Sequence, residues 1–79
     1  MYKLTKHVNA LYATIEKIEL KIEQLEEKRD QIEDNALEND RDMTTREIQQ
    51  YDRLTDQIDC LEYEIEAIQD AISYIEEYT

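Results

Sequence analysis

The chain has 79 residues, of which 41% are hydrophobic and 38% are charged, and its net charge is −12. A chain of this length makes one domain, and its apolar content excludes intrinsic disorder. No apolar stretch approaches the roughly 20 residues that cross a membrane, and no signal-peptide core follows Met1. We therefore expect a folded cytoplasmic protein that does not enter a membrane.

The first predicted element is a helix over about residues 3–35. Apolar side chains recur there at alternating spacings of three and four residues, which is the a/d pattern of a coiled coil. This a/d row consists of Leu4, Val8, Leu11, Ile15, Ile18, Ile22, Leu25, Arg29, Ile32 and Ala36. Arg29 is its charged member, and we interpret it as a residue that fixes the register or extends to solvent rather than a ligand-binding group.

A polar interval over about residues 36–43 predicts a turn. Asn near the end of a helix substitutes for Gly, and Asn35 and Asn39 stand at this place. Thr44 and Glu47 have the spacing of a capping box, which begins a new helix. The a/d phase also slips by one residue between the two rows. A single continuous helix is the alternative, because the chain contains neither Gly nor Pro to stop it.

The second helix is expected over about residues 44–78. Its a/d row consists of Tyr51, Leu54, Ile58, Leu61, Ile65, Ile68, Ile72 and Ile75. If the chain folds back, residues whose numbers sum to 83 face each other, and every a residue meets a d residue. We therefore predict an all-α antiparallel helical hairpin. Since two helices cover only one stripe of each other, we expect this hairpin to homodimerise into a four-helix bundle.

Heptad positions sort the charged residues into two faces. The acidic face is formed by positions b and e of both helices and contains Glu16, Glu19, Glu23, Glu26, Asp30, Glu33, Asp52, Asp59, Glu62, Glu66 and Glu76. The basic face is formed by positions c and g and contains Lys3, His7, Lys17, Lys21, Lys28, Arg53, Cys60, Glu64, Ala67, Ala71, Tyr74 and Tyr78. Two interpretations of the acidic face remain open: a solvated helix surface, or a mimic of the DNA phosphate backbone.

Apolar residues outside the a/d rows predict a second contact surface. We expect a dimer or partner interface that uses Tyr12, Leu20, Tyr63, Ala67, Tyr74 and Tyr78. The partner is expected to be a second copy of the chain and one unidentified host macromolecule. An alternative is binding of RNA or single-stranded DNA, in which phosphates would contact Lys3, Lys6, Lys17, Lys21 and Lys28.

Catalytic and metal-binding chemistry is not expected. His7 is the only histidine and Cys60 the only cysteine. The sequence has no Gly-rich phosphate loop, and no Glu-x-x-His pair of the kind that forms diiron sites. We therefore predict a noncatalytic protein without a metal, a cofactor or a small-molecule substrate.

Two resemblances bear on function. In size, the short acidic hairpin resembles small aspartyl-phosphate phosphatases that act on a sporulation response regulator. Their Ser-Gln-Glu-Leu-Asp signature is absent, and the nearest segment is Gln49-Gln50-Tyr51-Asp52, so their activity is not expected here. In composition, the chain resembles the small acidic host-takeover (early) proteins of lytic bacteriophages. That resemblance implies a regulator or inhibitor of a host protein in replication, transcription, division or RNA metabolism, and it assigns no residue.

Overall fold

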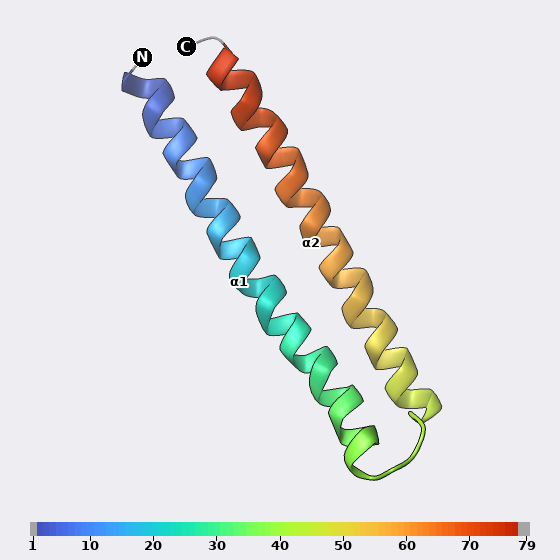
Figure 1. Ribbon diagram of the computed structural model, residues 1–79. Helices are drawn as coiled ribbons and strands as arrows, with labels where there is room; N and C mark the ends of the chain where they lie inside the picture. The colour runs from blue at the N-terminus through green and yellow to red at the C-terminus, as the bar shows by residue number, and fades with distance from the viewer. Residues whose placement is uncertain (1, 78–79) are drawn as a thin grey trace.

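The computed structural model is an antiparallel hairpin of two long helices (Figure 1). It describes the backbone of residues 2–77 and the side chains of residues 5–77. Helix α1 comprises Tyr2–Glu38 and helix α2 comprises Thr45–Glu77. The helices lie side by side along their whole length, in a rod of 58 × 15 × 13 Å. The predicted all-helical hairpin is therefore confirmed, and the single continuous helix is excluded.

The two predicted a/d rows form the contact between the helices. Every member of either row whose side chain is described is buried or half-buried. The buried core residues, with at most 7% of their surface exposed, are Ile15, Ile22, Ala36, Ile58 and Ile72. Outside the rows, the described side chains are exposed except at Met43, Glu47 and Thr55, which are half-buried. The 3-4 spacing in the sequence therefore identifies the core correctly.

Helix α1 ends in a Schellman motif, three residues later than the sequence suggests. Asp40 has a positive φ of 48°, its N–H donates to the carbonyl of Leu37 at 3.0 Å, and the N–H of Arg41 donates to the carbonyl of Ala36 at 3.1 Å. These two bonds satisfy carbonyls that the helix end leaves open. Asp is among the residues other than Gly that tolerate this conformation. The residue that turns the chain is thus Asp40 rather than an asparagine.

Helix α2 begins with the predicted capping box. The Glu47 N–H donates to Thr44 Oγ1 at 3.1 Å, and the Thr44 N–H donates to Glu47 Oε1 at 2.9 Å. Arg41 also donates to both carboxylate oxygens of Glu47, at 2.6 and 3.2 Å. Hydrogen bonds from Arg41 and from the Thr44 backbone lower the pKa of Glu47 to about 2. The turn is therefore held by one carboxylate that joins the end of α1 to the start of α2.

Candidate functional site

The two positions of the a/d rows differ in burial. All five buried core residues occupy a positions. The d positions hold eight residues with described side chains, and every one of them is only half-buried. We call these eight residues the open edge: Leu11, Ile18, Leu25, Ile32, Leu54, Leu61, Ile68 and Ile75. Four further a residues, Val8, Arg29, Tyr51 and Ile65, are half-buried, so the a positions are the more enclosed of the two and no described d residue is buried.

The open edge lies on one side of the hairpin, next to the basic face. Around a helix, position a is followed by e, whereas d is followed by g. The contact between α1 and α2 is therefore shifted toward the e side. Two observations on that side agree with this shift: Thr55, an e residue, is half-buried, and Arg29 Nη1 donates to Thr55 Oγ1 at 3.3 Å. The second helix therefore covers the d residues only in part, and the described g residues are exposed.

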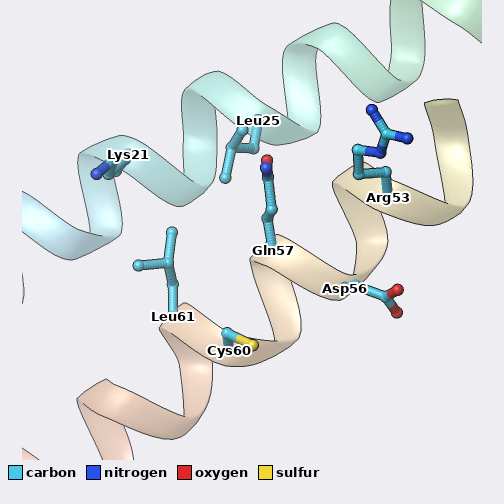
Figure 2. A pocket seen from close by; sticks show the side chains of 7 residues that line it. All are labelled: Lys21, Leu25, Arg53, Asp56, Gln57, Cys60 and Leu61. Carbon is cyan, nitrogen blue, oxygen red and sulfur yellow. The ribbon is translucent and has the colours of Figure 1, made fainter.

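Two grooves lie along the open edge between the helices. The larger, of about 450 Å³, is lined by Lys21, Leu25, Arg53, Asp56, Gln57, Cys60 and Leu61. Figure 2 shows Leu25 and Leu61 between the two helices and Gln57 extended toward α1, while Asp56 points away. The smaller, of about 310 Å³, is lined by Lys28, Ile32, Gln50, Arg53, Leu54 and Gln57. Because Arg53 and Gln57 line both, the grooves form one continuous depression with an apolar floor.

Basic side chains border this depression. Lys17, Lys21 and Lys28 are exposed and have no ion-pair partner among residues 5–77. Their positions place them on the same side as the open edge. Lys6 occupies an f position, on the outer side of α1. The side chains of Lys3 and Tyr78 lie outside the described residues. The lysines proposed for nucleic-acid binding therefore do not form a single row, because one of them points away from the others.

The acidic face is exposed over the length of the hairpin. All eleven of its carboxylate residues belong to the exposed class. Tyr12 donates to Glu76 Oε1 at 3.4 Å, and a hydrogen bond to Glu33 raises the pKa of Tyr51. The guanidinium of Arg29 lies 5.4 Å from the centre of the Tyr51 ring. Arg29 thus leaves the a/d row toward the acidic face, where its charge has a hydroxyl and an aromatic partner.

The predicted partner-interface residues are exposed but are not gathered into one patch. The exposed fractions are 49% for Tyr12, 57% for Leu20, 75% for Tyr63 and 63% for Tyr74. Leu20 and Tyr63 occupy f positions, so they lie on opposite outer sides of the hairpin. Tyr12 lies beside the acidic face, whereas Tyr74 and the exposed Ala67 lie on the basic face of α2.

Sequence reasoning missed the open edge because it treated the a and d residues alike. The signal was present in the heptad order, since d is adjacent to g, but it requires knowing that the helices meet on the e side. Two exposed apolar residues beside the turn were missed as well, namely Leu37, 74% exposed, and Ile48, 43% exposed. Both are isolated in the heptad pattern.

Comparison with known proteins gives no relative. No protein-family model, no curated protein and no solved structure matches this chain. Within the described part of the chain, no helix is long and apolar enough to cross a membrane, and no three His, Cys, Asp or Glu side chains are grouped so that they could hold a metal ion. The surfaces of the hairpin are therefore the features from which a function can be inferred.

Proposed function

We propose that the chain is a noncatalytic binding module that acts as a homodimer and regulates another macromolecule. In this proposal the open edges of two hairpins pack together into a four-helix bundle, and the outer faces remain accessible to the target. The observation that carries the proposal is the half-buried state of all eight d residues on one side. In a four-helix bundle each helix has two neighbours, so the a/e side and the d/g side are both covered.

The exposed area of the hairpin supports the proposal. The hairpin exposes 6475 Å², whereas a compact monomer of its 9.5 kDa mass exposes about 5,000 Å². The excess is about 1,400 Å². A standard protein interface covers about 800 Å² on each partner. One interface along the open edge would therefore remove more than half of the excess, and its centre would be the apolar d residues.

Sedimentation velocity at micromolar concentration tests the dimer. We expect the unsubstituted chain to have twice the monomer mass, and Ala71→Glu to reduce it to the monomer mass. Ala71 is exposed in the hairpin and occupies a g position beside the open edge. The matched control is Ala13→Glu, which makes the same change at an exposed f position on the outer side. A monomeric unsubstituted chain, or equal loss of the dimer in both variants, would contradict the proposal.

Binding of RNA or single-stranded DNA is the alternative use of the same side. Lys17, Lys21 and Lys28 border the open edge, so a nucleic acid and a second hairpin would compete for it. We expect a short RNA at low salt to leave the sedimentation of the dimer unchanged. If RNA instead converts the dimer into an RNA-bound monomer, Lys17→Glu should weaken the RNA binding. That result would favour the nucleic-acid hypothesis.

The acidic face supports a second candidate, in which the target is a protein that binds DNA. Eleven exposed carboxylates run along a rod 58 Å long, and rows of negative charge attract basic grooves. Host proteins captured by the immobilised chain should then be displaced by duplex DNA. Reversal of Glu19, Glu62 and Glu66 to Lys should abolish that capture, whereas the control Lys17→Glu should keep it. Capture that persists after the reversal would exclude the DNA mimic.

A further inference from the structure

The distribution of charge along the g positions distinguishes two ways of building the proposed dimer. We infer that the two hairpins associate with their turns at the same end of the bundle. Helix α1 of each protomer then packs against α2 of its partner, with Lys21 beside the partner's Glu64. This inference rests on the proposed homodimer and adds its orientation and its contact residues.

Two closed arrangements can bring the open edges together. If the two-fold axis runs along the hairpin, the turns lie at the same end and α1 faces the partner's α2. If the axis is perpendicular to the hairpin, the turns lie at opposite ends and each helix faces its own copy. Both arrangements are isologous and cover the same apolar surface. The flanking g residues decide between them, because such residues set the orientation of helices in coiled coils.

The g residues of the two helices differ in charge. On α1 the described g residues are His7, Thr14, Lys21, Lys28 and Asn35. On α2 they are Gln50, Gln57, Glu64 and Ala71. All of them are exposed in the single hairpin. Among the g residues the cations therefore lie on α1 and the one anion lies on α2, whereas Arg53, which lines both grooves, is a c residue of α2.

The arrangement with both turns at one end pairs unlike charges. Residues at the same height in the hairpin have numbers that sum to about 83, as shown by the bond between Arg29 and Thr55. A two-fold axis along the hairpin keeps these heights across the new interface. Lys21 then meets the partner's Glu64, and Thr14 meets the partner's Ala71. The ion pair occurs twice in the dimer, and no g residue meets one of like charge.

The opposite arrangement brings like charges together. The middle of α1, which comprises Tyr2–Glu38, falls next to Lys21, so an antiparallel pair of α1 helices with full overlap places Lys21 against its own copy. Glu64 would then lie near Gln57 of the partner subunit and would lack a cation. Like charges in direct contact across an interface are unfavourable and exclude the wrong orientation.

Disulfide cross-linking between different protomers tests the orientation directly. One sample of the chain carries Thr14→Cys and another carries Ala71→Cys, both with Cys60→Ser, because Cys60 is an exposed free thiol. The two samples are mixed, unfolded, refolded and oxidised, and the products are separated on a non-reducing gel. Since each chain has a single cysteine, a bond within one hairpin is impossible. A two-fold axis along the hairpin brings the two positions within the Cα distance that a disulfide requires.

We expect a covalent heterodimer from the mixture and little covalent product from either sample alone. The control for the opposite arrangement is Lys21→Cys with Cys60→Ser, which would cross-link to its own copy in that arrangement. Cross-linking of this control, or a mixture that stays non-covalent although sedimentation shows a dimer, would overturn the orientation while leaving the proposed dimer intact. A monomeric unsubstituted chain would overturn the dimer itself, and the orientation with it.

A charge exchange gives an independent measurement. Lys21→Glu and Glu64→Lys should each raise the dimer dissociation constant by about tenfold, since each creates two contacts between like charges. The double variant should return the constant to near its original value. In the opposite arrangement the two residues do not meet, so the double variant would show only the sum of the single effects.

Discussion

The unequal burial of the a and d residues predicts that two similar truncations have different costs. Ile58→Ala and Leu61→Ala each remove about three carbon atoms, worth about 2.4 kcal/mol at about 0.8 kcal/mol for each methylene. Ile58 is 3% exposed, so its truncation also leaves a cavity, and we expect a loss of about 3 kcal/mol. Leu61 is half-buried, so in the single hairpin its truncation should cost about half as much.

Dimerisation changes the cost at Leu61 but not at Ile58. In the proposed dimer a second hairpin covers the open edge, so Leu61 would become buried only above the dimer dissociation constant. Urea unfolding followed by circular dichroism, at protein concentrations below and above that constant, measures both values. We expect the loss at Leu61 to rise toward that at Ile58 as the concentration increases. Equal losses at low concentration would refute the shift of the hairpin contact toward the a/e side.

Three further predictions concern the turn and the charged residue of the a/d row. The pKa of Glu47 is about 2, below its ordinary value of 4.5, so the stability it provides is complete above about pH 4.5 and is lost as the pH falls through 2. The difference in stability between the unsubstituted chain and Glu47→Gln should therefore shrink between pH 5 and pH 2 in an acid titration, and a constant difference would contradict this. Asp40→Gly should raise the free energy of urea unfolding by about 0.5 kcal/mol, because Gly adopts positive φ without strain; the control Asp42→Gly should lower it. Arg29→Leu should raise the free energy of urea unfolding by up to about 1 kcal/mol, because a polar residue at an a position costs stability. A decrease would show that the contacts of Arg29 outweigh that cost.

Periodicity is sufficient to predict the core, and local chemistry to predict one end of the turn. The 3-4 spacing identifies every residue that the hairpin buries, because those positions face the second helix most directly. The Thr44 and Glu47 pair is visible in the sequence, since its two hydrogen bonds depend on residues three apart. The end of α1 is less predictable. Asp40 closes the helix through backbone bonds to Leu37 and Ala36, and several neighbouring residues have side chains suited to the same role.

The site was less predictable than the core because it depends on a rotation of the helices. Heptad letters place a and d together on one stripe, and they do not state on which side of that stripe the partner helix lies. In the structure, contacts of Arg29 with Thr55 and Tyr51 join the helices on the e side. Small shifts of this kind follow from side-chain packing between distant residues. The sequence therefore indicates which apolar residues lie outside the a/d rows, but it does not indicate that the d residues form the accessible row.

The difference in charge between the e and g positions has a physical reason, because the contact between α1 and α2 lies toward the e side. Glu19 and Glu62 occupy e positions at similar heights and are both exposed, so the e side of the hairpin carries like charges from both helices, whose repulsion water weakens. The turn joins these two helices covalently, and a short connection gives them a high effective concentration that offsets such repulsion. No covalent link joins two protomers, so the contact between them cannot tolerate the same repulsion. The residues that flank the open edge fit this requirement in the proposed dimer, where Lys21 would meet Glu64 of the partner subunit, of opposite charge, and the neighbouring g residues on α2 are neutral.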